Sequence, residues 1–243
     1  MSAIAANISR IRAEIQQAAL AAGRNANDIM LLAVSKGQGI EALLEAYRAG
    51  IRDFGESYLQ EALGKVAALP QPDLRWHFLG PVQSNKTRRI AEHFAWLHSL
   101  DRLAIAERLA RQRPAGLLPL QVCLQVNLDD EPSKSGATPA ALEPLALAVT
   151  RLPGLRLRGL MAIPRPRHHI AEQRQAFRRL ADLLDQLRLR SPSLAGLDTL
   201  SMGMSADLQA AVAEGATIVR VGRALFGPRP ANPQQELPCT RAD

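Results

Sequence analysis

Cysteine is scarce in this chain, and long apolar segments are missing. Its 243 residues include only two cysteines, Cys123 in an apolar run and Cys239 near the C-terminus. Two such cysteines do not build a disulfide framework, which is typical of a protein from a reducing compartment. No run of roughly 18 or more apolar residues occurs, and no basic segment followed by an apolar core opens the chain. We therefore expect a cytoplasmic protein with no membrane-spanning helix and no secretion signal.

Aromatic residues are also rare, at 4% of the chain, whereas positive charge is abundant. The net charge of +7 and the pI of about 10.2 also occur among nucleic-acid-binding proteins. Here, however, the excess charge comes from arginines spread along predicted helices without interleaved aromatic side chains. This pattern favours a solvated, arginine-rich surface, and nucleic-acid binding is an alternative that rests on charge alone. The arginines concerned are Arg102, Arg108, Arg111, Arg113, Arg174, Arg178 and Arg179.

Strand-like and helix-like segments alternate along the chain. An amphipathic helix comes first, and each of eight apolar strand-like segments is then followed by a helix, the last one short. The predicted strands are 29–36, 52–56, 75–80, 96–100, 118–128, 155–163, 197–200 and 217–221. This alternation predicts an α/β fold, a single TIM-like (β/α)8 barrel over residues 1–228 with an extra N-terminal helix. The Pro-rich, polar segment 229–243 is expected to be a flexible C-terminal tail.

The first predicted strand ends in Lys36. In a barrel, chemistry is found at the C-terminal ends of the strands and in the loops that follow them. A lysine buried there loses part of the stabilisation of its charged form. It can pair with an anion, or act as a neutral nucleophile that condenses with a carbonyl group. The ordinary alternative is a side chain that extends into solvent.

Two segments near the last strands have the features of an anion-binding site. The turn Ser201–Ser205 offers hydroxyl groups, a glycine and the N–H groups of a helix expected to start at Ser205. Gly222 follows the eighth strand, and barrels often bind phosphate after strands seven and eight. If Lys36 and Arg220 both face inward, strand pairing makes them neighbours at the top of the barrel. A reactive lysine, an anion site and an arginine suit pyridoxal 5′-phosphate, although Ser201–Ser205 alone is equally compatible with an ordinary capped turn.

Seven short motifs occur in order along the predicted barrel. They are Ala33-Val34-Ser35-Lys36; Phe54-Gly55-Glu56 with Gln60-Glu61; Trp76-His77-Phe78-Leu79-Gly80 with Gln83-Ser84-Asn85-Lys86; Gln125-Val126-Asn127 with Ser133-Lys134-Ser135-Gly136; Gly159-Leu160-Met161-Ala162-Ile163-Pro164; Ser201-Met202-Gly203-Met204-Ser205; and Val219-Arg220-Val221-Gly222 with Phe226-Gly227. Together they resemble the pyridoxal 5′-phosphate homeostasis proteins, also described as proline synthase co-transcribed homologues. These proteins look like the barrel half of alanine racemase without its C-terminal β-domain.

The resemblance implies a barrel of pyridoxal-phosphate fold type III. It implies that Lys36 forms a Schiff base with the cofactor and that Arg220 contacts its pyridine nitrogen. The phosphate is expected on Ser201, on the backbone around Gly203 and Gly222, and on residue 223. For His77, a support role behind the site and an ordinary satisfied strand histidine are equally compatible with the sequence. The complete expected cofactor-binding set is Lys36, Ser57, His77, Met161, Ser201, Gly203, Met204, Arg220, Gly222 and Arg223.

Two positions depart from the family pattern. Ser57 stands where the family usually has asparagine, so the contact near the cofactor ring becomes shorter or water-mediated. Arg223 stands where the family usually has serine or threonine, so a hydroxyl contact to phosphate is lost while the backbone N–H is kept. The guanidinium either replaces that contact with a charge-assisted hydrogen bond or extends into solvent, and we expect solvent.

The resemblance also bears on catalysis. An arginine at the pyridine nitrogen makes the ring a weaker electron sink than an aspartate does. The second base of alanine racemase is a tyrosine from the C-terminal domain of a partner subunit, whereas Tyr47 and Tyr58 of this chain lie on early predicted helices. We therefore expect a monomeric carrier without catalytic residues, which serves vitamin B6 and amino-acid homeostasis and passes pyridoxal phosphate to apoenzymes. A weak amino-acid racemase is the alternative. We expect no metal, because His168-His169 lacks further ligands at metal spacing.

Overall fold

The computed structural model describes residues 2–131 and 134–228. Its strands are β1 (Met30–Val34), β2 (Asp53–Glu56), β3 (Arg75–Phe78), β4 (Trp96–Leu100), β5 (Leu120–Gln125), β6 (Leu155–Met161), β7 (Thr199–Ser201) and β8 (Ile218–Val221). Its α-helices are α1 (Ala3–Ala21), α2 (Ile40–Arg48), α3 (Leu59–Ala68), α4 (Thr87–His93), α5 (Leu103–Gln112), α6 (Leu142–Thr150), α7 (Ile170–Arg190), α8 (Leu208–Ala213) and α9 (Arg223–Phe226), and its 3₁₀ helices are η1 (Ala26–Asp28), η2 (Ser84–Lys86), η3 (Pro139–Ala141) and η4 (Pro192–Leu194).

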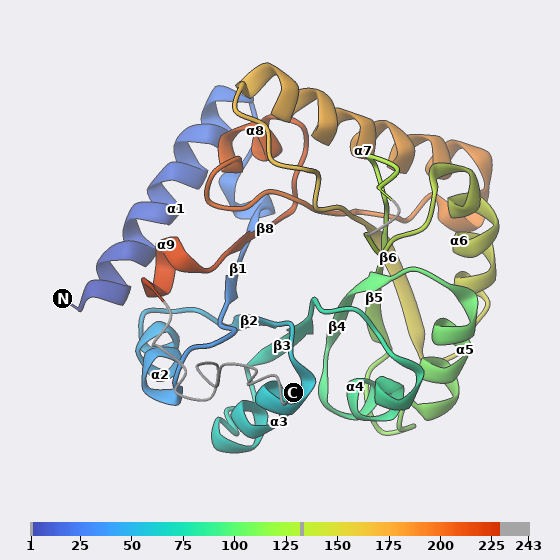
Figure 1. The fold of residues 1–243 in the computed structure, drawn as a ribbon, viewed down its shortest axis with the longest axis horizontal. Helices are drawn as coiled ribbons and strands as arrows, with labels where there is room; N and C mark the ends of the chain where they lie inside the picture. The colour runs from blue at the N-terminus through green and yellow to red at the C-terminus, as the bar shows by residue number, and fades with distance from the viewer. Residues whose placement is uncertain (1, 132–133, 229–243) are drawn as a thin grey trace, which may run out of the picture.

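The strands form a closed barrel in chain order. Every neighbouring pair is parallel, and β8 closes the barrel by pairing with β1. Figure 1 shows the helices as an outer ring around the strands. β1 packs on helices outside it and on side chains inside the barrel, so its sequence, Met30–Val34, is a continuous apolar run. The predicted (β/α)8 barrel with an additional N-terminal helix is confirmed.

The extra helix α1 completes the outer ring beside the shortest helices. Its isoleucines at helical spacing, Ile4, Ile8, Ile11 and Ile15, are all buried. The helix contacts α8 and α9, so it covers the part of the barrel where β8 is followed by only a four-residue helix (Figure 1). Ser2 caps its first turn by accepting a hydrogen bond of 3.2 Å from the N–H of Ala5.

Several boundaries differ from the predicted ones. β1 ends at Val34, so Lys36 lies in the loop after the strand and not at its last position. The helix expected from Ser205 begins only at Leu208. The reason is a turn: Asp207 accepts a hydrogen bond of 2.6 Å from the N–H of Met204, and its own N–H donates to the Met204 carbonyl. The backbone N–H of Ser205 therefore belongs to a turn and not to a helix N-terminus.

An apolar cluster occupies part of the barrel interior. Leu32, Trp96, Cys123, Met161 and Ile218 form this cluster, which is separate from the larger core between strands and helices. Burial raises the pKa of the Cys123 thiol to about 12, so it packs as a neutral side chain. In the described ranges 2–131 and 134–228, no helix is long and apolar enough to cross a membrane. The predicted tail 229–243 lies outside the described residues.

Candidate functional site

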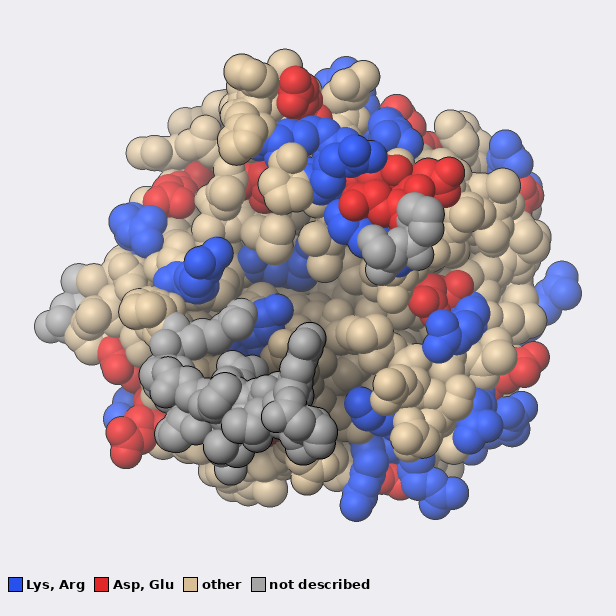
Figure 2. Space-filling model, in the orientation of Figure 1, with Lys and Arg blue, Asp and Glu red and all other residues tan. Residues whose placement is uncertain are grey.

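A cavity of ≈ 420 Å³ opens at the C-terminal ends of the strands. Figure 2 shows this face of the molecule hollowed near its centre, with lysine and arginine side chains along the rim. Seven of the ten predicted cofactor-binding residues line the cavity. They are Lys36, Ser57, Met161, Met204, Arg220, Gly222 and Arg223, whereas His77, Ser201 and Gly203 lie behind its walls.

Lys36 is half-buried in the loop after β1, and the backbone on both sides of it is fixed. On one side, the carbonyl oxygen of Ser35 accepts a hydrogen bond of 2.7 Å from Nζ of Lys65. On the other side, the N–H of Gly37 donates to Oε1 of Glu61 at 2.6 Å. Both partners come from α3, so this helix determines where Lys36 enters the cavity.

Lys65 is a buried ammonium group whose three N–H donors all have partners. Besides the Ser35 carbonyl, it donates to Oε1 of Glu56 at 2.7 Å and to Oε1 of Glu61 at 2.6 Å. Burial raises the pKa of Glu56, although Lys65 and the Ser35 hydroxyl oppose this effect. Sequence reasoning did not identify Lys65. The available signal was its i, i+4 spacing from Glu61 on a predicted helix.

Arg220 on β8 is buried and lines the same cavity as Lys36. Its Cα lies opposite that of Leu32, so the prediction that Arg220 and Lys36 are strand neighbours is wrong. Lys36 comes later in the chain, in the loop beyond β1, and therefore lies nearer the cavity mouth. Burial lowers the pKa of Arg220 to about 10, which leaves the guanidinium protonated at neutral pH. The guanidinium donates to Ser201 Oγ at 2.8 Å and to the Ala162 carbonyl at 2.9 Å.

Polar side chains continue inward from Ser201. Its Oγ lies 2.7 Å from Nδ1 of His98, and Nε2 of His98 lies 2.9 Å from Nδ1 of His77. The other nitrogen of His77, Nε2, lies 2.9 Å from Oδ1 of Asp53. His77 and Ser201 thus contact protein groups inside the barrel. Sequence reasoning missed Asp53 and His98, for which the signal is a polar residue within an apolar strand.

The turn after β7 and the start of α9, which adjoins the Lys36 loop, form another part of the cavity wall. Gly203 has a φ of 88°, and a Cβ at this position would collide with the side chain of Ala211, so only glycine fits the turn. Helical hydrogen bonds in α9 begin with the N–H of Leu225, which donates to Gly222. The N–H groups of Arg223 and Ala224 come before Leu225 in the chain and form no hydrogen bond within α9, and both residues line the cavity. Backbone N–H groups at such a position suit an anion.

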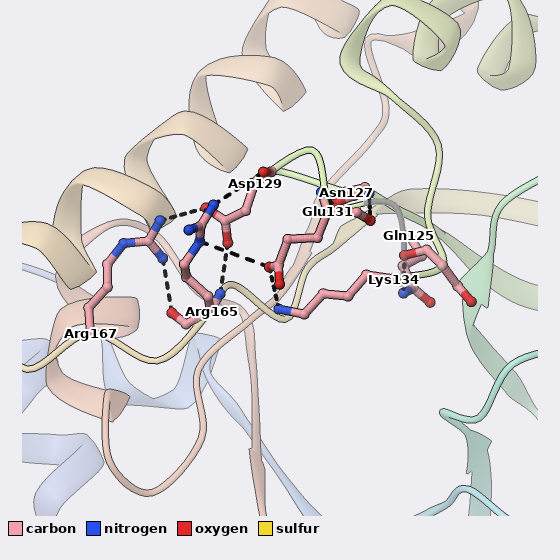
Figure 3. Close-up of polar contacts among 8 residues, drawn as sticks. Gln125, Asn127, Asp129, Glu131, Lys134, Arg165 and Arg167 are labelled. Atoms are coloured by element: carbon pink, nitrogen blue, oxygen red, sulfur yellow. Dashed lines mark hydrogen bonds and ion pairs between the residues drawn. The ribbon is translucent and has the colours of Figure 1, made fainter.

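A second cavity of ≈ 230 Å³ adjoins the first one and shares Leu79 and Ile163 with it. Its rim is held by an ion-pair network that joins the loops after β5 and β6 (Figure 3). Asp129 accepts from the backbone N–H of Arg165 at 2.7 Å and from the guanidinium of Arg167 at 2.6 Å. Burial raises the pKa of Asp129, but these hydrogen bonds outweigh burial and hold it below its usual value.

Lys134 also belongs to this rim. Its Nζ lies 2.7 Å from Oε1 of Glu131, and Figure 3 shows both side chains beside Arg165. Lys134 lines the second cavity and not the first. Across residues 2–131 and 134–228, no group of three His, Cys, Asp or Glu side chains is placed to hold a metal ion.

Comparison with known proteins identifies the family. The family model described as "Alanine racemase, N-terminal domain" matches residues 1–230. A pyridoxal phosphate homeostasis protein of Pseudomonas aeruginosa is 62% identical over 229 residues, which cover 94% of this chain and 97% of that protein. The chain belongs to the pyridoxal phosphate homeostasis protein family.

Two further proteins are similar over nearly their whole length. The Escherichia coli K12 member is 50% identical over 232 residues, covering 94% of this chain and 98% of that protein. PipY of Synechococcus elongatus, solved with pyridoxal phosphate (PLP) bound, is 40% identical with a TM-score of 0.81, covering 92% of this chain and 100% of PipY. An alanine racemase of Corynebacterium glutamicum, at 19% identity and a TM-score of 0.63, shares the fold over 95% of this chain and 61% of the racemase.

Proposed function

We propose that this protein binds pyridoxal 5′-phosphate in the cavity at the C-terminal end of the barrel and holds it as a Schiff base on Lys36. The observation that carries this proposal is that one cavity combines the Lys36 amine, the Arg220 guanidinium and the backbone turn at Gly222. Its volume of ≈ 420 Å³ falls in the range of small-molecule sites, about 300–1,000 Å³. PipY, at 40% identity, was solved with PLP bound, which supports PLP as the ligand of this chain.

The residues present fit the chemistry of this cofactor. Pyridoxal phosphate supplies an aldehyde that condenses with a primary amine. Lys36 offers that amine, and Ser205 and the N–H groups of Arg223 and Ala224 are placed in the wall to hold the phosphate. Arg220 is fixed by two hydrogen bonds and is suited to contact the pyridine nitrogen.

We further propose that the protein is a carrier in vitamin B6 homeostasis and not an efficient enzyme. The described residues that line the cavity include no carboxylate, imidazole, thiol or phenol that could act as a second acid or base opposite Lys36. Tyr47 is held elsewhere by a hydrogen bond of 2.9 Å to Asp73. Transfer of the cofactor to apoenzymes in the cytoplasm is the role that follows for a site that binds an aldehyde reversibly.

Spectroscopy and peptide mapping test the proposal. Added pyridoxal phosphate should give the absorbance band expected of a protonated Schiff base, at about 420 nm. Borohydride should then fix the cofactor on the peptide that contains Lys36. Lys36→Ala should remove that labelled peptide, whereas Lys86→Ala, a change in the lysine of η2, should leave it in place. No label on Lys36 in the wild-type protein would overturn the proposal, and fast racemisation of alanine that depends on Lys36 would favour the racemase alternative.

A further inference from the structure

A single file of buried polar groups crosses the interior of the barrel. It runs from Asp53 on β2 through His77 on β3, His98 on β4 and Ser201 on β7 to Arg220 on β8, and no member is more than 6% exposed. Consecutive partners lie 2.9, 2.9, 2.7 and 2.8 Å apart. The file connects the base of the barrel, where Asp53 lines a separate cavity, with the ligand cavity at the top.

With both histidines neutral, the two ends of this file determine the direction of every hydrogen bond in it. An ionised carboxylate only accepts hydrogen bonds, and a guanidinium only donates them. Asp53 is also held by Arg75, which donates to both carboxylate oxygens at 2.7 and 2.6 Å. His77 must therefore donate from Nε2 to Asp53. At the other end, Ser201 must accept from Arg220.

The middle of the file follows from the same rule. A neutral His77 that donates from Nε2 accepts at Nδ1, so His98 must donate from its Nε2. A neutral His98 then accepts at Nδ1, and Ser201 must donate its hydroxyl proton to it. His77, His98 and the Ser201 hydroxyl thus each donate once and accept once within the file. An extra proton on Nδ1 of His77 would set two N–H groups against each other, whereas an extra proton on Nδ1 of His98 would remove the acceptor of the Ser201 hydroxyl.

Both histidines are in surroundings that keep them neutral. Burial lowers the pKa of His77, although Asp53 opposes this effect, and burial lowers the pKa of His98 well below its usual value. The cationic neighbour Arg220 acts on His98 in the same direction. These surroundings agree with the two neutral rings on which the assignment depends.

We propose that Asp53 and His98 are positioning residues for Arg220, because they force the Ser201 hydroxyl to donate into the barrel and to accept from the guanidinium. Ser201 then holds Arg220 in place. The Ser201 hydroxyl donates its proton to His98 and therefore does not donate it to a phosphate. With its other end group bonded to the Ala162 carbonyl, the Arg220 guanidinium is oriented before any ligand enters. The role of Arg220 towards a cofactor rests on the proposed function, whereas the arrangement of protons does not.

Nitrogen NMR of the protein without cofactor tests the arrangement. The chain has five histidines, so ¹⁵N-histidine labelling gives a spectrum that His77→Gln and His98→Gln variants can assign. We expect both His77 and His98 to be neutral Nε2–H tautomers between about pH 6 and 8, a range that includes the usual histidine pKa. An Nδ1–H tautomer or a charged ring at either position would overturn the proposal.

A matched pair of variants tests whether Asp53 is the cause. Asn in Asp53→Asn can either accept from or donate to His77, so we expect both tautomers in the folded variant. Arg75, the other partner of Asp53, has an exposed side chain. Arg75→Gln removes its charge and should leave His77 and His98 as single Nε2–H tautomers. Unchanged tautomers in Asp53→Asn, or the same mixture in Arg75→Gln, would overturn the assignment to Asp53. Because no cofactor is present, these outcomes are separate from the peptide map that tests the Schiff base on Lys36.

Discussion

The ammonium of Lys65 donates a hydrogen bond of 2.7 Å to the carbonyl oxygen of Ser35, the residue that immediately precedes Lys36. The proposed reactive lysine is thus held by a second, buried lysine that does not enter the cavity. Lys65 is itself balanced by Glu56 and Glu61. Stability and the placement of Lys36 therefore depend on the same three charges.

The change Lys65→Met should destabilise the protein by about 3–5 kcal/mol, the cost of removing one partner of a buried ion pair. Glu56 is left in the core without its cation, so its pKa rises further above that of an unfolded carboxyl group. The native state then binds more protons than the unfolded state, and the variant should lose stability as the pH rises from about 5 to 8. Urea unfolding at both pH values measures the effect.

The double variant Lys65→Met/Glu56→Gln is the control for this interpretation. Removing the unpaired carboxylate should restore part of the lost free energy of unfolding and should flatten its dependence on pH. If the double variant is no more stable than Lys65→Met, an uncompensated Glu56 charge is not the cause of the loss.

Asp129→Asn should loosen the two loops that Asp129 joins. The carboxylate accepts from Arg165 and Arg167, and these contacts outweigh burial in setting its lowered pKa. Their contribution is present above the unfolded carboxyl pKa of about 3.9 and is lost as the pH falls through the folded value. At neutral pH we expect hydrogen exchange of the Arg165 amide to quicken on the order of threefold to tenfold, because a neutral amide replaces partly exposed ion pairs.

A matched change on the outer surface checks the Asp129 result. Asp185→Asn removes the same charge from an exposed pair with Arg188 on α7. Its effect on exchange at Arg165 should be negligible. Equal acceleration in both variants would show that net charge, and not the contacts of Asp129, controls the loops.

The cavity walls could largely be predicted from the sequence. Lys36, Met161 and Gly222 follow from one rule, that a parallel barrel presents chemistry at the C-terminal ends of its strands. Alternation along β8 also predicts that Arg220 faces inward. It does not predict the register between strands, in which Arg220 pairs with Leu32 and not with Lys36. The start of α8 was similarly uncertain because Asp207 forms a turn before it.

The sequence does not predict which side chains meet inside the barrel. Asp53, His98 and Ser201 come from β2, β4 and β7, and strand pairing brings only adjacent strands together. His77 links Asp53 to His98 along neighbouring strands. His98 and Ser201 meet across the barrel because its closure turns inward side chains towards one another. Lys65 was missed for a related reason. An i, i+4 pair with Glu61 is normally a solvated surface pair, and its burial depends on how α3 packs under the Lys36 loop.

Arg223 allows the phosphate end of the cavity to be tested directly. Its side chain is exposed at the start of α9, and the backbone N–H groups of Arg223 and Ala224 do not depend on it. An exposed charge is screened by salt, so Arg223→Gln should raise the dissociation constant for pyridoxal phosphate by no more than about threefold at 0.15 M salt. Arg223→Thr should bind at least as tightly as Arg223→Gln, because a hydroxyl at this position can donate to the phosphate.

Fluorescence or absorbance titration at 0.05 and 0.5 M salt measures these constants. Arg111→Gln, an exposed arginine on α5, is the control for net charge. The ratio of the Arg223→Gln dissociation constant to that of the wild type should be smaller at 0.5 M than at 0.05 M salt. It should be only slightly larger than the same ratio for Arg111→Gln. A loss of about thirtyfold or more that persists in 0.5 M salt would contradict the expectation. It would mean that the guanidinium bonds directly to the phosphate, since a charge-assisted hydrogen bond contributes about 1.5–3 kcal/mol.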